Sequence, residues 1–368
     1  MPGRTGGAPL PVEYAARRAA VAAGLKERQL DALLVPALPN VRYLTGFTGS
    51  NGMVLVREGD AVLFTDPRYR VQASEQADCR VTVSRGPLLP QVVSAIARRR
   101  VRRLGFERSR ISFDIYDLLR SQLPLKTSLE PVAASVERLR LVKSAREIAL
   151  IRQSVETSSQ AFEQAVRQAR PGMRETDLAG EIEYRMRRLG AEKPAFETIV
   201  AAGARSALPH AFPTRAAFRV RNLVLVDMGA FQQGYASDMT RMLFFGTPGP
   251  KVKRLYRAVL EAQLAAIAAV RAGVQAAAVD RAARRVLRAE GFERAFVHST
   301  GHGLGLEIHE APRLGKGEKT RLEAGMTVTV EPGAYLEGFG GVRVEDTVVV
   351  TGTGCEILTP TAKELRVI

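Results

Sequence analysis

The hydrophobic pattern of the first third of the chain alternates between predicted strands and helices. Residues 11–28 have a helical pattern, and "DALLVP" (31–36) has the continuous apolar run of a buried strand. "MVLVRE" and "AVLFTD", within residues 53–66, predict a β-hairpin because Gly59 and Asp60 supply a turn between them. "RVTVS" and "RLGFE" add further strands, with helical patterns between them. This alternation is typical of an α/β domain, which we expect to occupy residues 1–130.

A helical segment without glycine or proline, residues 138–168, is predicted to open a second domain that covers residues 131–368. Two segments of equal length follow it, residues 170–190 and 271–291. Both begin with Arg-x-Gly and end in Gly, and their apolar residues fall at matching positions. The shared spacing indicates an internal repeat.

Two predicted strands that each carry an acid follow each of the repeated segments. The first pair is "LVLVDMGA" with Asp227 and "SDMTRMLFFG" with Asp238. The second pair is "TVTVEPGA" with Glu331 and "VEDTVVVTG" with Glu345. Chance agreement between helix–strand units is the alternative, but duplication explains the repeated order of helix, glycine and two acids better. We therefore expect two halves packed about a pseudo-twofold axis, within an overall α/β (α+β) fold.

The composition is that of a globular protein with a sizeable core, because 46% of the 368 residues are hydrophobic and 25% are charged. The chain has 54 Lys and Arg against 38 Asp and Glu, which gives a net charge of +16. Such a charge is found in proteins that bind nucleic acid or membranes. However, the basic residues are scattered, and the densest run, residues 98–110, contains one aromatic residue and no recognisable nucleic-acid motif. We therefore predict no nucleic-acid partner and no membrane partner.

Cysteine usage and the apolar segments both favour the cytoplasm. Cys79 and Cys355 lie far apart and have no metal or redox spacing, which is typical of a reducing compartment. The N-terminus lacks the apolar core of a signal peptide. Charged and polar residues interrupt the Ala-rich segment at 260–279, so it does not predict a membrane span. We expect a soluble, cytoplasmic protein.

Packing of the two halves face to face would bring the four acids Asp227, Asp238, Glu331 and Glu345 together. Clustered carboxylates in apolar surroundings repel one another and take up protons unless cations neutralise them. Two divalent ions about 3.5–4 Å apart, bridged by some of the carboxylates, meet this requirement. Oxygen-rich ligation favours Mn²⁺ or a similar ion, with Co²⁺ or Zn²⁺ as alternatives. Salt-bridged strand ends would explain one such acid but not four.

Three of the four histidines, His298, His302 and His309, lie within the thirteen residues "HSTGHGLGLEIHE". The alternating glycines of this stretch argue against a metal-binding helix, because each weakens a helix by about 1 kcal/mol relative to alanine. They indicate instead a backbone that turns sharply or is closely approached. His302 is the leading candidate for the imidazole that completes the metal site.

The other histidines are suited to act on a substrate. Hydrolysis of an amide requires donors for the tetrahedral intermediate and a proton for the leaving nitrogen. His210, in "GARSALPHAF", and His309 are predicted to supply them. His298 is expected to line a pocket. A packed or surface histidine is the alternative for each residue taken singly.

Several motifs together resemble the pita-bread metallopeptidases, in the proline-directed branch that holds prolidase (Xaa-Pro dipeptidase) and aminopeptidase P. They are "VDMGAFQQGYASDMTR", "SALPHA", "GHGLGLEIHE" and "EPGAY…GGVRVEDT". "NVRYLTGFTGSNG" and "TDPRY" resemble the creatinase-type N-terminal domain of the same branch, so the resemblance covers nearly the whole chain. It implies hydrolysis of the peptide bond that precedes proline.

The resemblance also implies a role for each site residue. Asp227 would bind one metal, Asp238 and Glu345 would bridge both, and His302 and Glu331 would bind the second, with Glu331 also counted as catalytic. The resemblance further implies that His210 and His309 bind the substrate and stabilise the intermediate. It places His298 near the proline pocket and Arg343 in support of the site and of substrate binding.

Arg205 stands where asparagine is common in the family, and we predict that it contributes to recognition of the substrate's carboxylate. The leading hypothesis is a dipeptidase that acts on Xaa-Pro, and the close alternative is an aminopeptidase P that acts on longer peptides. A non-catalytic pita-bread binding protein is a remote alternative, because such relatives typically lose metal ligands and this sequence has all five. The family also suggests a homodimer.

Overall fold

The computed structural model describes residues 11–368, and the chain divides into two compact units between Arg140 and Leu141. This division lies ten residues after the expected boundary. The first unit extends further because β6 (Ser128–Val132) pairs with β5 (Arg103–Glu107) and so belongs to the first sheet.

The helical segment predicted at 138–168 is interrupted. It forms α6 (Ser135–Leu141) and α7 (Ala145–Val166), with Ser144 between them. The Ser144 side chain accepts a hydrogen bond from the Glu147 N–H at 3.3 Å, and the Glu147 carboxylate accepts one from the Ser144 N–H at 2.9 Å. This reciprocal capping box starts a new helix, and the sequence carries its signature in Ser-x-x-Glu.

The first unit is built on a six-stranded mixed sheet in the order β4-β3-β2-β1-β5-β6. The predicted hairpin is present as β2 (Gly52–Arg57) and β3 (Asp60–Thr65), next to β1 (Ala32–Val35) and β4 (Arg80–Val83). The same unit contains the helices α1 (Pro11–Glu27), α2 (Leu38–Thr45), α3 (Arg70–Gln76), α4 (Leu88–Arg98) and α5 (Phe113–Gln122). The expected α/β character of this region is confirmed.

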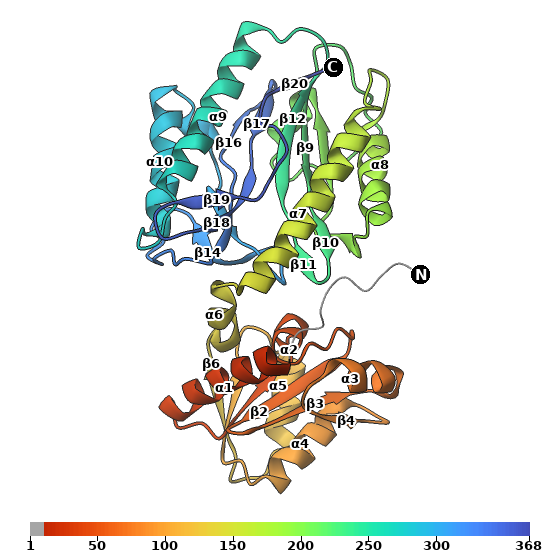
Figure 1. The fold of residues 1–368 in the computed structure, drawn as a ribbon, viewed down its shortest axis with the longest axis vertical. Coiled ribbons are helices and arrows are strands. Elements are labelled where there is room, and N and C mark those ends of the chain that lie inside the picture. The colour runs from red at the N-terminus through yellow and green to blue at the C-terminus, as the bar shows by residue number, and fades with distance from the viewer. Residues whose placement is uncertain (1–10) are drawn as a thin grey trace. The chain divides into compact units, whose positions relative to one another are not determined.

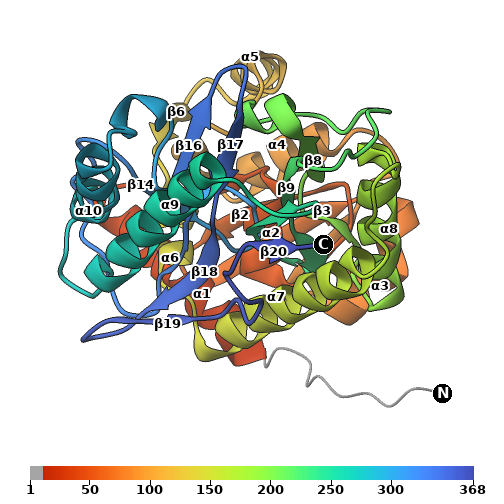
Figure 2. The same cartoon turned by 90° about the horizontal axis from the view of Figure 1, so that it is seen from above.

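The second unit consists of two halves, each with a helix pair and a sheet. In the first half, α7 and α8 (Glu175–Arg188) pack on the sheet β20-β12-β9-β8. In the second half, α9 (Pro250–Ala269) and α10 (Ala276–Ala289) pack with the sheet β14-β13-β15-β18-β19. Figures 1 and 2 show the two helix pairs on opposite flanks of the strands. The strands are β8 (Ile199–Ala202), β9 (Leu223–Met228), β12 (Met239–Phe244), β13 (Gly301–Gly303), β14 (Glu310–Leu314), β15 (Thr327–Val330), β18 (Asp346–Val350), β19 (Cys355–Ile357) and β20 (Arg366–Val367).

Backbone details at equivalent places support the predicted internal repeat. Gly172 before α8 and Gly273 before α10 have φ values of +90° and +84°, which glycine adopts readily. An isolated antiparallel bridge follows each of them, Arg174 with Ala217 and Gln275 with Arg321. The pita-bread fold expected from the sequence is therefore built from two similar halves.

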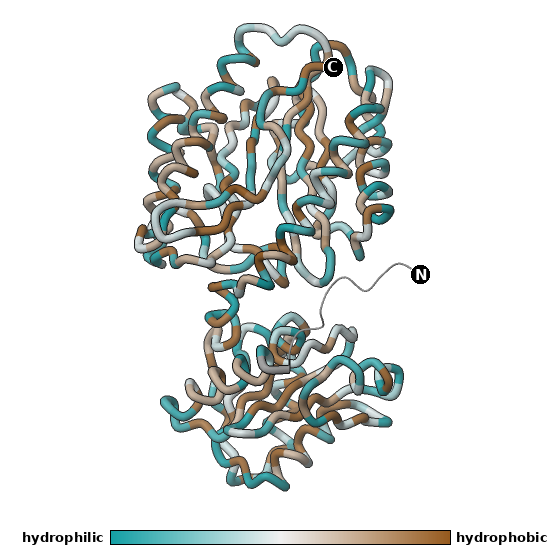
Figure 3. The backbone as a smooth tube through the Cα atoms, in the orientation of Figure 1, coloured by the Kyte–Doolittle hydropathy of each residue, from teal (hydrophilic) through white to brown (hydrophobic). Residues whose placement is uncertain are grey.

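Burial on both faces explains why the strands of the second unit are almost continuously apolar. In β9, Val224 and Val226 pack in the cluster of α7 and α8, whereas Leu223 and Leu225 pack in the cluster of α9 and α10. Side chains alternate along a strand, so Asp227 shares the face of Leu223 and Leu225. The acid is therefore directed toward the second half. Figure 3 shows the hydrophobic strands inside and the mixed polarity of the outer helices.

Two short sheets complete the second unit. The hairpin of β16 (Gly333–Leu336) and β17 (Gly340–Arg343) leads to Glu345, and β11 (Tyr235–Ala236), β10 (Ala230–Gln232) and β7 (Lys193–Pro194) form the other sheet. Within residues 11–368, every helix is either too short or too polar to cross a lipid bilayer.

Candidate metal centre and substrate cavity

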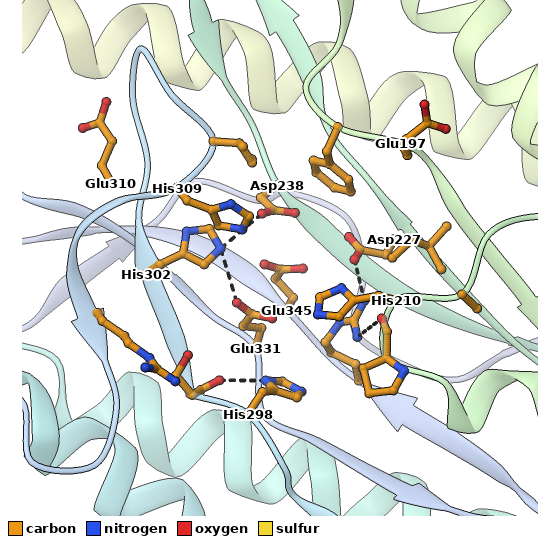
Figure 4. A pocket seen from close by; sticks show the side chains of 18 of the residues that line it. Glu197, His210, Asp227, Asp238, His298, His302, His309, Glu310, Glu331 and Glu345 are labelled. Carbon is orange, nitrogen blue, oxygen red and sulfur yellow. Dashed lines mark hydrogen bonds and ion pairs between the residues drawn. The ribbon is translucent and has the colours of Figure 1, made fainter. Parts of the chain in front are cut away.

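Carboxylates from the two halves converge in the interior of the second unit. Oxygen atoms of Asp227, Asp238 and Glu345 lie within 4.8 Å of one another. Asp227 lies in β9, Asp238 directly precedes β12, and Glu345 directly precedes β18. Glu331 follows β15 and approaches the same place. The predicted meeting of four acids is thus present (Figure 4).

Burial makes this cluster unfavourable without a cation. Asp238 and Glu345 are only 5% and 1% exposed, and burial together with the neighbouring carboxylates raises the pKa of both well above its usual value. Two buried oxygens, Asp227 Oδ1 and Glu345 Oε1, have no hydrogen-bond partner in the described part of the chain. Buried oxygens of this kind normally have a donor or an ion as partner. The donor set therefore fits divalent cations.

His302 presents an unprotonated nitrogen to the acids. Its Nδ1 lies 3.0 Å from the carbonyl oxygen of Gly303, which only accepts, so Nδ1 carries the proton. Nε2 then faces Asp238 Oδ2 at 3.6 Å and Glu331 Oε1 at 3.4 Å. Burial lowers the pKa of His302, which favours the neutral ring. A neutral nitrogen facing two carboxylates is what a shared cation requires.

The alternating glycines allow the strand that carries His302 to lie close to its neighbours. A Cβ atom on Gly301 would lie 2.0 Å from the carbonyl oxygen of Thr329, and one on Gly303 would lie 2.2 Å from that of Ala311. Any side chain at these positions would push the backbones apart. The prediction of a close approach, rather than a helix, is confirmed, and it explains why His302 reaches the acids.

The acids predict how the stability of the metal-free protein depends on pH. Burial raises the pKa of Glu331 from 4.5 to about 7, so the folded protein holds this proton more tightly than the unfolded chain. Stability from this group is complete below about pH 4.5 and is lost as the pH rises through about 7. We expect the Tm of chelator-treated protein to fall across this interval. Thermal denaturation of Glu331→Gln, in which the dependence should be weaker, is the matched control; an equal slope would contradict the assignment.

A cavity of about 620 Å³ opens onto the acids. His210, His298 and His309 line it together with His302, although they come from three separate loops. Figure 4 shows the rings of His210 and His309 on either side of the carboxylates. His309 packs edge-on against His302, with ring centres 4.4 Å apart. The structure thus brings all four histidines of the chain to one cavity.

The buried Arg343 and the partly buried Tyr335 form a support at the wall of this cavity. Arg343 is ion-paired with Asp227, and its Nη1 donates to the Tyr335 hydroxyl at 2.8 Å. Tyr335 in turn donates to His298 Nε2 at 2.9 Å, because Nδ1 of that ring donates to the Ser299 carbonyl. Burial raises the pKa of Tyr335 to about 12 and lowers that of His298 to about 4, so both groups are neutral. Sequence reasoning missed Tyr335, although it is the tyrosine of the "EPGAY" motif.

Arg205 does not lie where a residue that binds the substrate's carboxylate would have to lie. It is not among the residues that line the cavity. Its Nε donates to both carboxylate oxygens of the buried Glu175, at 3.2 Å each, and its Nη2 donates to the carbonyl oxygen of Phe212 at 2.6 Å. The guanidinium therefore holds a loop and does not face the substrate space.

Other residues of the cavity wall were not predicted. Phe196, Ile199, Phe212 and Ile308 make part of it apolar, and Glu197 and Arg313 add exposed charges. The sequence signals that could have indicated them are weak. Phe196, Glu197 and Ile199 lie in the β-rich stretch "FETIV", Phe212 follows His210 by two residues, and Ile308 and Arg313 lie close to His309. Thr240 donates to Glu345 Oε2 at 2.7 Å and accepts from Arg343 Nε at 2.9 Å, so it links two predicted site residues.

Two family models match this chain. The model of metallopeptidase family M24 matches residues 149–352, and that of the creatinase/prolidase N-terminal domain matches residues 17–142. The Xaa-Pro dipeptidase of Pyrococcus horikoshii is 35% identical over 93% of this chain and 96% of its own length.

Two solved structures also superpose along almost the whole chain. The Xaa-Pro dipeptidase from Bacillus anthracis gives a TM-score of 0.94 at 36% identity, covering 96% of this chain and 100% of that one. The X-Pro aminopeptidase from Thermotoga maritima gives 0.88 at 36% identity, covering 93% and 99%. The M24 model matches more than half of the chain, and the N-terminal model matches most of the residues before it. This chain therefore belongs to metallopeptidase family M24 and carries a creatinase/prolidase N-terminal domain.

Proposed function

We propose that this protein hydrolyses the Xaa-Pro bond, and that its preferred substrates are dipeptides. The observation that carries the proposal is the convergence of four carboxylates and a neutral imidazole at a cavity that holds three further histidines. Membership of a metallopeptidase family implies divalent metal ions. The relatives are named Xaa-Pro dipeptidase and X-Pro aminopeptidase, and these names indicate which bond is cleaved.

Five residues would hold two ions, with Mn²⁺ as the ion that the oxygen-rich donor set favours. Asp227 would bind the first ion, His302 and Glu331 the second, and Asp238 and Glu345 both. The oxygens of Asp238 and Glu345 lie within 4.8 Å of each other and of Asp227, which supports their sharing an ion with Asp227. Bound ions would polarise the scissile carbonyl and lower the pKa of water.

The remaining groups of the cavity would act on the peptide itself. His210 and His309 flank the carboxylates and are exposed to the cavity, so either ring can donate to an oxygen that gains charge in the transition state. His298 is held by Tyr335 and Ser299, which suits a fixed wall for the proline ring. Arg343 would orient Asp227 through their ion pair.

Arg313 replaces Arg205 as the candidate for binding the free carboxylate of a dipeptide. It lines the cavity, it is exposed, and within residues 11–368 no hydrogen bond or ion pair holds its guanidinium. Arg343, the other arginine of the cavity, is buried and engaged with Asp227. An arginine fork without a partner matches a carboxylate in geometry and charge. This feature favours a dipeptidase over an aminopeptidase that acts on longer chains.

We expect Arg313→Ala to raise KM for Ala-Pro about tenfold or more, because a charge-assisted pair contributes about 1.5–3 kcal/mol. KM for Ala-Pro amide, which lacks the carboxylate, should hardly change. Steady-state kinetics on both substrates is the measurement, with the exposed Arg294 changed to alanine as a control outside the cavity. A matching loss on both substrates would show that Arg313 does not read the carboxylate.

Hydrolysis of Ala-Pro, Ala-Pro-Ala and longer peptides, together with metal analysis, tests the function as a whole. A dipeptidase cleaves Ala-Pro much faster than the longer peptides, whereas an aminopeptidase reverses this order. Bound metal without hydrolysis of any of them would indicate a binding protein. The cytoplasmic location and the homodimer also remain parts of the proposal; the family suggests the dimer, and the two free cysteines are compatible with a reducing compartment.

A further inference from the structure

Two buried carboxylates on the outer helices of the second unit are not part of the metal cluster. Glu175 is the first residue of α8, and Asp280 lies in the second turn of α10; both are 0% exposed. The helices α8 and α10 occupy equivalent places in the two halves and lie on opposite flanks (Figure 1). Each carboxylate is paired with an arginine and accepts a hydrogen bond from a threonine hydroxyl.

The Glu175 pair holds the loop that carries His210. The carboxylate accepts from the Ala202 N–H at 2.8 Å and from the N–H and hydroxyl of Thr214, at 2.9 and 2.6 Å. These contacts fix both ends of the segment between residues 202 and 214. Arg205, bound to the same carboxylate, donates to the carbonyl of Phe212, two residues after His210. The loop is therefore tied to the helix on both sides of the histidine.

The Asp280 pair holds the loop that carries His298 in a similar way. Arg284 Nε donates to Asp280 at 2.8 Å, and its two Nη atoms donate to the carbonyls of Phe296 and His298, at 3.1 and 2.6 Å. The guanidinium also lies over the Phe296 ring, 4.2 Å from its centre. Thr300 donates to Asp280 at 2.9 Å, and its own carbonyl accepts from the Glu331 N–H at 2.7 Å.

We propose that Arg205 and Arg284 are positioning residues, each of which sets the place of one cavity histidine. The two buried carboxylates that they bind lie on helices at opposite flanks of the second unit. A buried carboxylate orients each guanidinium, and the guanidinium then binds carbonyls that no helix or strand would otherwise hold. Charge-assisted hydrogen bonds of this kind are short and directional, so they limit motion of the loop. The kinetic consequence rests on the proposed function; the placement of the histidines does not.

Histidine resonances test the placement directly, because the chain has only four histidines. The variants neutralise each pair together, Glu175→Gln with Arg205→Gln and Asp280→Asn with Arg284→Gln, so that no buried charge is left alone. We expect the first to shift the ring signals of His210 and leave His298 in place, and the second to do the reverse. Shifts of all four histidines together, or of none, would overturn the proposal.

Controls and a second set of variants keep the result interpretable. Arg288→Gln removes a surface ion pair with Glu293 one turn beyond Arg284, and Arg185→Gln removes one with Glu181 on α8; neither should move a histidine signal. If a neutralised pair does not fold, Arg205→Lys and Arg284→Lys retain the charge but cannot bind the carboxylate and the carbonyls at once. The same selective shifts are expected from them, and their absence counts against the proposal.

A double-mutant cycle tests the effect on the reaction. We expect neutralisation of the Glu175–Arg205 pair to lower kcat/KM for Ala-Pro about tenfold, since small misplacements of a catalytic group are costly. In a His210→Ala background the same change should cost less than about twofold, because the two effects share one cause. Equal losses in both backgrounds would show that Arg205 does not act through His210. A parent enzyme without Xaa-Pro hydrolysis would contradict the proposed function, while the histidine signals would still decide the placement.

Discussion

Asp238→Asn is expected to abolish peptide hydrolysis and to lower the metal content, while the fold stays intact. Asp238 is 5% exposed, with Asp227 and Glu345 within 4.8 Å and His302 Nε2 at 3.6 Å. A neutral amide cannot bridge two cations as a carboxylate does. The fold should survive because the substitution removes a charge whose burial is itself unfavourable. Metal analysis, kcat and circular dichroism on the same preparation measure the three effects.

The exposed Asp117→Asn on α5 is a control for the loss of one carboxylate elsewhere in the chain. It should retain both metal and activity. Near-normal turnover of Asp238→Asn at controlled metal occupancy would exclude a bridging role for this residue, and with it the two-ion site in its proposed form.

His309→Ala should keep its metal and lose most of kcat. His309 lines the cavity and packs against the ring of His302, but only His302 has an imidazole nitrogen within 4 Å of the carboxylates in the described part of the chain. The His309 ring is therefore available to donate to the intermediate, and removal of one such donor typically costs about 10²–10³ in kcat. Steady-state kinetics and metal analysis of the purified variant measure both outcomes.

His302→Ala is the matched comparison, because it removes the neighbouring imidazole and should lower metal content instead. If His309→Ala lost metal and His302→Ala did not, the two histidines would have exchanged roles. The pair of variants thus separates binding of the ions from action on the peptide.

Short sequence patterns predicted those features of the metal centre and the fold that depend on neighbouring residues. The acids could be paired because the two halves repeat the same order of helix, glycine and strands, and Asp227 lies on the inward face of its strand. The glycines beside His302 signalled a close approach, and Thr329 and Ala311 are the backbones that approach. Ser144 and Glu147 also carried a start signal for α7, although the absence of glycine and proline favoured one continuous helix.

Contacts between distant segments decided what the sequence did not. Arg205 has the charge to bind a substrate carboxylate, but Glu175, thirty residues earlier, takes up its guanidinium. Tyr335 joins His298 to Arg343 only because the β16–β17 hairpin lies beneath the loop of His298. A residue's type and spacing determine which bonds it is able to make. Type and spacing were sufficient to predict that the four acids and His302 lie together. Which partner it binds depends on which groups folding brings within about 3 Å. For Arg205 and Tyr335 only the tertiary structure decides that, whereas Arg284 pairs with Asp280 four residues earlier on its own helix and owes only its carbonyl partners to the tertiary structure.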